Sequence, residues 1–247
     1  MISNIKILFL TIILVSCSEK SVDPNSAESS FIAAKKLYDD DNDEKAITML
    51  EEFKARFPYS KLAVEAELLV ANAFFKLQKF EEASYSYRQF VKMHPTNSMA
   101  PFAQFRIGES YWRISPEAIN REQEYTQKAL DEWKILISNY PTSKESQEAQ
   151  TLIPKGEEKI AKSHEFIANF YYKKEKWHAC AYRFHILSEK YPEYINSKKS
   201  SLLKAAFAFE QLAKEKNDKN NDENLYFKNF SQKDLLEKAR ELRLKAE

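Results

Sequence analysis

The amino-acid sequence predicts an all-α protein, a right-handed superhelical solenoid of about five helical hairpins. Two observations carry this prediction: glycine is rare, and one spacing of small, apolar and proline residues recurs along the chain. Only 2 glycines occur among 247 residues, whereas tight β-hairpins and phosphate-binding loops depend on glycine at positive φ. The recurring spacing is typical of helical repeats whose units stack on one another.

The first residues differ from all that follow. Lys6 precedes an apolar stretch from residue 7 to residue 15, after which come Ser16 and Cys17. This stretch is too short to span a bilayer, which needs about 20 apolar residues. A positive charge followed by a short apolar run is instead typical of an export signal. We therefore expect a signal peptide over residues 1–16.

The order Leu-Val-Ser-Cys at residues 14–17 resembles the lipobox of bacterial lipoproteins, in which the cysteine becomes the lipid-bearing first residue. The resemblance implies lipidation of Cys17. With Ser18 next, it also implies an outer-membrane location facing the periplasm. An ordinary signal peptide with an incidental cysteine is the alternative. Residues 17–27 are predicted to be the lipidated cysteine and a flexible tether, because they are polar and lack periodicity.

Four segments share a proline ending and a small residue twelve positions before it. The prolines are Pro58, Pro95, Pro141 and Pro192, and the small residues are Ala46, Ala83, Ala129 and Cys180. Apolar residues follow each small residue after four and seven positions, which places them on one face of a helix. Each segment is therefore predicted to be a helix that ends just before its proline.

A partner helix is expected before each of these. Ala46, Ala83 and Cys180 are each preceded by another small residue, twelve positions earlier. In the third segment, the equivalent residue is Gly108, 21 positions before Ala129. The other three are Ala34, Ala71 and Ala168. The constant offset indicates two short antiparallel helices joined by a tight turn. The nine extra residues of the third block, 115–123, predict an expanded loop.

A fifth, looser unit begins near Lys199 and has Ala206 at the small position. Its second helix is predicted from about Ser231, a natural N-cap, to Lys245. We thus expect hairpins one and two over residues 28–98, hairpin three over 99–160, and hairpins four and five over 161–247.

The pattern resembles the tetratricopeptide repeat, which has small residues at its eighth and twentieth positions and proline at its thirty-second. In such solenoids the inner groove is lined by one face of the first helices. We expect the groove-lining residues to stand three positions before, one after and four after the small residue of each first helix. The predicted peptide-binding groove consists of Phe31, Tyr38, Leu68, Asn72, Phe75, Phe105 and Trp112. Such aromatics suit an extended apolar peptide, unless several pack against neighbouring hairpins.

Charge and motifs argue against other classes of function. Lys and Arg number 38 against 37 for Asp and Glu, so no electrostatic footprint for nucleic acid is present. His178 and His185 lie seven residues apart, which is not the spacing of a metal-binding pair on adjacent helical turns. Nucleotide-binding and hydrolase motifs are missing from the sequence. We therefore expect a protein without metal, cofactor or catalytic activity.

Taken together, the chain resembles the BamD family, lipoprotein subunits of the machinery that inserts β-barrel proteins into the bacterial outer membrane. The resemblance rests on the lipobox at Cys17, the five units and the expanded loop of the third. It also includes segments 57–71 and 90–97, whereas the Asn/Asp/Lys-rich loop before the last helix departs from the family.

This resemblance implies a non-catalytic receptor that binds unfolded outer-membrane proteins through its N-terminal hairpins. It implies docking of the C-terminal hairpins onto the barrel subunit BamA and other assembly lipoproteins, with Lys198 and Lys199 as candidate contacts. The alternative is a different periplasmic tetratricopeptide lipoprotein, an adaptor for cell-envelope or cell-wall assembly.

Overall fold

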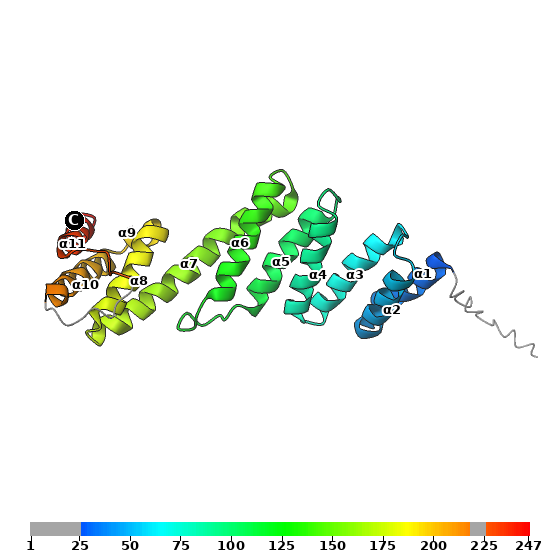
Figure 1. Ribbon diagram of the computed structural model, residues 1–247, viewed down its shortest axis with the longest axis horizontal. Helices are drawn as coiled ribbons and strands as arrows, with labels where there is room; N and C mark the ends of the chain where they lie inside the picture. Colours follow the sequence, from blue (N-terminus) through cyan, green and yellow to red (C-terminus); the bar gives the residue numbers. More distant parts are fainter. Residues whose placement is uncertain (1–25, 218–225) are drawn as a thin grey trace, which may run out of the picture.

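The computed structural model describes residues 26–217 and 226–247, and these form eleven α-helices. Figure 1 shows the helices following one another along the long axis of the molecule, from the blue N-terminal end to the red C-terminal end. The helices are α1 (Ala27–Asp39), α2 (Asp43–Arg56), α3 (Leu62–Lys76), α4 (Phe80–Met93), α5 (Ala100–Ile114), α6 (Glu124–Asn139), α7 (Lys144–Lys173), α8 (Trp177–Lys190), α9 (Pro192–Asn196), α10 (Lys199–Asn217) and α11 (Gln232–Leu244).

Consecutive helices pack as hairpins, α1 with α2, α3 with α4, α5 with α6, α7 with α8, and α10 with α11. The described part of the chain contains no strand, so the all-α fold of helical hairpins is confirmed. The right hand of the superhelix stays a prediction. The predicted signal peptide and Cys17 lie outside the described residues, as does most of the Asn/Asp/Lys-rich loop.

Three of the hairpin turns have the same backbone geometry. One residue in each turn adopts a positive φ, and these residues are Asp41 (57°), Gln78 (58°) and Glu175 (55°). The amide of the next residue donates to the carbonyl five residues earlier, at 2.8, 2.9 and 3.0 Å. This hydrogen bond closes the C-terminus of the first helix. It accounts for the constant offset between the two helices of a pair.

The small residues predicted as close contacts are completely buried. Alanine or cysteine occupies eight of these positions with no exposed surface: Ala34, Ala46, Ala71, Ala83, Ala129, Ala168, Cys180 and Ala206. At the ninth, Gly108, an added Cβ would lie 2.4 Å from the Trp133 Nε1 atom. The helices approach so closely there that only a hydrogen atom fits.

Helix α7 is 30 residues long and spans two units of the solenoid. Its first half packs on α6 and its second half on α8, so the expected division at residue 160 falls within a continuous helix. Gly156 permits this packing, because a Cβ at that position would lie 2.5 Å from Leu130 Cδ2. In Figure 1, α7 connects the green central hairpins with the yellow-to-red C-terminal helices.

Two further local predictions are confirmed. Helix α5 ends at Ile114 and α6 begins at Glu124, which leaves the expected expanded loop between them. Ser231 caps α11 in a capping box: its side chain accepts from the Asp234 amide, and the Asp234 carboxylate accepts from the Ser231 amide. None of the described helices is long and apolar enough to cross a membrane.

Candidate binding surfaces

Three of the seven predicted groove residues lie in the hydrophobic core. Phe31, Leu68 and Phe105 retain only 4%, 8% and 7% of their surface exposed. Phe31 packs on Phe53, with ring centroids 5.5 Å apart, and Phe105 stacks on Trp133 at 6.0 Å. The expectation that these three side chains line an open groove was wrong.

The physical reason is their position relative to the small residue of the same helix. A residue three before the small residue lies one turn away on the same helical face. That face contacts the neighbouring helices, because the small residue allows the closest approach. The positions four after it also lean towards this face. Accordingly Tyr38, Phe75 and Trp112 are half-buried rather than fully exposed.

A cation covers the ring of each of these three aromatic residues. Lys76 Nζ lies 4.2 Å from the Tyr38 ring centroid, Arg106 Cζ 3.8 Å from that of Phe75, and Lys159 Nζ 5.0 Å from that of Trp112. We call these six residues the cation-covered row. Aromatic faces attract cations within about 6 Å. The row therefore combines apolar ring edges with positive charge.

The lysine and arginine cations of the row belong to the first helices or to α7 and were not predicted. Arg106 pairs with Glu109 at 2.7 Å, and Lys76 pairs with Asp41 at 2.7 Å. Asn72, the remaining groove candidate, is half-buried and accepts a hydrogen bond from the Tyr87 hydroxyl at 2.6 Å. Burial raises the pKa of Tyr87 well above its usual range, so this hydroxyl remains a donor. In the sequence, Lys76 stands one residue before a turn and Arg106 stands two residues before Gly108. Both placements are too common to identify a site.

The structure separates the two docking candidates at the start of α10. Lys198 donates to Glu165 Oε2 and to the Tyr194 hydroxyl, both at 2.8 Å. Although burial opposes ionisation, hydrogen bonds from Lys198, Ser201 and Tyr194 hold the pKa of Glu165 below its usual value. Lys198 is therefore engaged within the protein. Lys199 is exposed.

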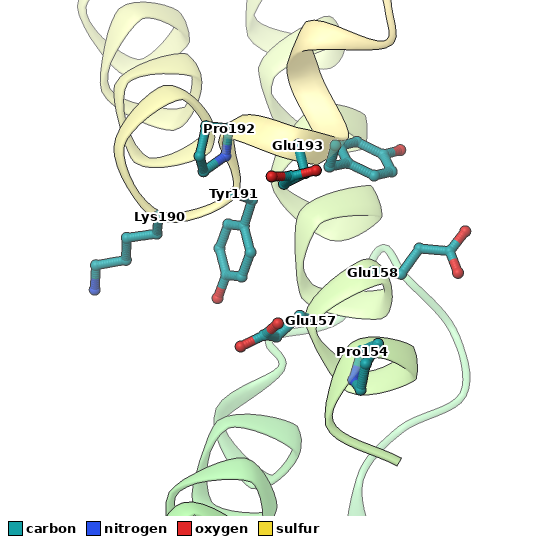
Figure 2. A pocket seen from close by; sticks show the side chains of 8 residues that line it. Pro154, Glu157, Glu158, Lys190, Tyr191, Pro192 and Glu193 are labelled. Atoms are coloured by element: carbon teal, nitrogen blue, oxygen red, sulfur yellow. The ribbon is translucent and has the colours of Figure 1, made fainter. Parts of the chain in front are cut away.

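Figure 2 shows a pocket of about 410 Å³ between α7 and the junction of α8 and α9. Its lining residues are Pro154, Glu157, Glu158, Lys190, Tyr191, Pro192, Glu193 and Tyr194. Glu157 pairs with Lys134 at 2.8 Å and Glu158 with Lys162 at 2.6 Å. Burial, followed by the charge of Glu157, raises the pKa of Tyr191 to about 12. Two of the three carboxylates thus already have a cationic partner, and the pocket offers mainly rings and prolines.

Comparison with known proteins gives a consistent match. The family model described as YfiO, outer membrane lipoprotein, matches residues 24–225. The chain is similar to the outer membrane protein assembly factor BamD of Rickettsia prowazekii, with 26% identity over 57% of this chain and 57% of that protein. It is also similar to the assembly factors BamD of Xylella fastidiosa (23% identity, 76% of this chain, 69% of that protein) and Vibrio cholerae (22%, 68% and 73%). The alignment thus spans little more than half the length of the Rickettsia relative.

Proposed function

This chain belongs to the YfiO/BamD family of outer membrane lipoproteins, and we propose that it is a non-catalytic scaffold and receptor subunit of the machinery that assembles β-barrel proteins in the outer membrane. The observation that carries the proposal is the family match over residues 24–225, which includes the first four of the five hairpins in full. In this proposal the protein binds unfolded outer-membrane proteins and docks onto a BamA-like barrel subunit and other assembly lipoproteins.

The cation-covered row is the proposed contact for unfolded barrel proteins. Its half-buried rings offer apolar edges to an aromatic side chain of a peptide. Arg106 and Lys76 already pair with Glu109 and Asp41, whereas Lys159 forms no ion pair among the described residues and donates to the Ser115 hydroxyl. Its positive charge suits the carboxylate of a chain terminus. Because the rings are already held by cations and by their own helices, a peptide meets a preformed surface and little ordering is lost on binding.

The C-terminal hairpins are the proposed docking end. Lys199 is exposed at the first residue of α10 and remains the better candidate for a partner carboxylate. Lys198, bound to Glu165 at 2.8 Å, positions the start of that helix. Lipidation at Cys17 is the proposed anchor in the outer membrane, with the solenoid in the periplasm.

The buried thiol of Cys180, the small contact residue of α8, is consistent with a protein that binds its partners and catalyses no reaction. Cys180 is fully buried, and burial raises the pKa of its thiol to about 12. A protonated, buried thiol is a poor nucleophile. Its size suits the close contact between α8 and its neighbours.

Depletion of the protein from the cell is the direct test of this function. We expect the amounts of outer-membrane β-barrel proteins to fall, while periplasmic soluble proteins stay at their usual amounts. Normal amounts of barrel proteins after depletion would contradict the proposal. Normal barrel proteins together with defects in the cell wall would favour the adaptor alternative.

Replacing Phe75 by Ala is expected to weaken the binding of a peptide that ends in phenylalanine by about tenfold, or about 1.4 kcal/mol. The substitution removes the ring that Arg106 covers at 3.8 Å. Fluorescence anisotropy of a labelled peptide measures the affinity. Tyr85→Ala, an exposed aromatic on α4, is the matched control and should bind as the wild type does. Equal affinity of both variants and the wild type would remove the row from the binding site.

A further inference from the structure

Helix α7 presents a stripe of lysine and phenylalanine to solvent. Its members follow one another at intervals of three or four residues and are Lys155, Lys159, Lys162, Phe166, Phe170 and Lys173. This spacing keeps their side chains on one helical face. At 1.5 Å per residue, the stripe is about 27 Å long. All six are exposed except Lys159, which is half-buried.

The two phenylalanines form an apolar site in the C-terminal half of this stripe. Phe166 is 48% exposed and Phe170 53% exposed, and they lie one turn apart in the C-terminal half of α7. Helix α5, in the preceding hairpin, approaches α7 at two residues. Trp112 of α5 lies beside Gly156, and Ser115, the residue after α5, accepts a hydrogen bond from Lys159. The phenylalanines lie two turns or more beyond these contacts. Neighbouring exposed aromatic side chains are characteristic of an interaction surface.

The charge around the phenylalanines is predominantly positive. Lys155 and Lys173 pair with no carboxylate among the residues that the structure describes, and Lys162 pairs with Glu158 at 2.6 Å. The neighbouring carboxylate of α7, Glu165, is half-buried and accepts from Lys198, Tyr194 and Ser201. Its charge is therefore compensated inside the protein. A partner that complements this surface carries carboxylates on either side of its apolar side chains.

The stripe continues a surface that the N-terminal hairpins begin. Lys159 belongs to both: its Nζ lies 5.0 Å from the Trp112 ring and donates to Ser115 Oγ at 3.0 Å. A length of about 27 Å matches about eight residues of extended polypeptide at 3.3 Å each. Two phenylalanines between lysines provide little apolar area for insertion into a bilayer. Continuity and length therefore favour a peptide over a lipid surface.

We propose that the α7 stripe binds an extended acidic segment of a partner polypeptide. Phe166 and Phe170 receive its apolar side chains, and Lys155, Lys162 and Lys173 pair with its carboxylates. This site differs from the cation-covered row in the number of carboxylates that it selects, several along an acidic segment instead of the single one of a chain terminus. Binding at the α7 stripe does not require that a chain terminus binds at the cation-covered row.

A synthetic peptide tests the proposal with the full-length protein in detergent. The probe is a labelled dodecapeptide in which Asp flanks two Phe residues, and the matched probe has Asn in place of every Asp. We expect Lys155→Glu with Lys173→Glu, and separately Phe166→Ala with Phe170→Ala, to weaken binding of the acidic peptide by about tenfold each. Lys45→Glu with Lys92→Glu changes the same charge on exposed positions of α2 and α4 and should leave the affinity unchanged. The Asn probe should bind more weakly than the Asp probe.

Equal affinity of the acidic peptide for the wild type and both stripe variants would overturn the proposal. A second arm, after removal of the detergent, compares vesicles of phosphatidylcholine with vesicles that contain an equal part of phosphatidylglycerol. If the stripe variants abolish a preference for the anionic vesicles and leave peptide binding unaltered, the surface serves a membrane and the proposal is wrong. Circular dichroism should show unchanged helicity, because all substituted side chains are exposed. Failure of the Phe75→Ala test would leave these results unaffected, since none of the stripe residues substituted here belongs to the cation-covered row.

Discussion

Gly108→Ala is expected to destabilise the protein by about 1–3 kcal/mol, although alanine is the better helix former by about 1 kcal/mol. The new Cβ would lie 2.4 Å from Trp133 Nε1 and 2.6 Å from Trp133 Cδ1. Trp133 has little room to yield: it is fully buried and its ring centroid lies 6.0 Å from that of Phe105 and 5.8 Å from that of Trp112. The helices α5 and α6 would have to move apart.

The effect of Gly108→Ala on stability is expected to change sign once Trp133 is removed. Trp133→Ala alone should cost about 3–5 kcal/mol, because it leaves a cavity at the contact of α5 and α6. In that background the Gly108 Cβ meets no ring, so Gly108→Ala should stabilise the variant by about 1 kcal/mol. Urea unfolding of the four proteins measures this cycle. If Gly108→Ala costs the same with and without Trp133, the close contact is not the reason for glycine at this position.

Acidification from about pH 7.5 to about pH 5 is expected to remove about 1–2 kcal/mol of stability through His164. Burial, followed by the charge of Arg183, lowers the pKa of His164 from 6.5 to about 4. The unfolded chain therefore binds a proton below about pH 6.5, whereas the folded chain does so only below about pH 4. The free energy of unfolding therefore decreases as the pH falls from about 6.5 to about 4, and the loss through His164 is complete below about pH 4.

His164→Asn isolates this effect from that of other groups. Arg183 Nη1 lies 3.3 Å from His164 Nδ1, and the asparagine Oδ1 atom accepts a hydrogen bond from a similar position without titrating. The difference in unfolding free energy between wild type and variant, measured at both pH values, should narrow or reverse in favour of the variant at the lower pH. A difference that is independent of pH would show that His164 is not buried in its neutral form.

The candidate surfaces show that spacing along one helix does not determine which side chains are exposed. Tyr38, Asn72, Phe75 and Trp112 were predicted from their offsets to the small residues and are partly accessible. Phe31, Leu68 and Phe105 satisfied the same rule and are buried. The offset rule cannot distinguish them, because the exposure of each depends on the size of side chains on two other helices. The cations of the row were not predicted for the same reason: Arg106 on α5 covers a ring on α3.

The sequence by itself determined the helical hairpins, their small contact residues and the expanded loop of the third unit, because each depends on residues within one short segment. The 3.6-residue period and the proline endings are local signals of this kind. The tertiary structure alone decided that α7 joins two units as one helix of 30 residues. Gly156 allows that helix to approach Leu130, whose Cδ2 would lie 2.5 Å from an added Cβ. The same continuity carries Phe166 and Phe170 beyond the reach of α5 and exposes them, which depends on the packing of helices distant in the sequence.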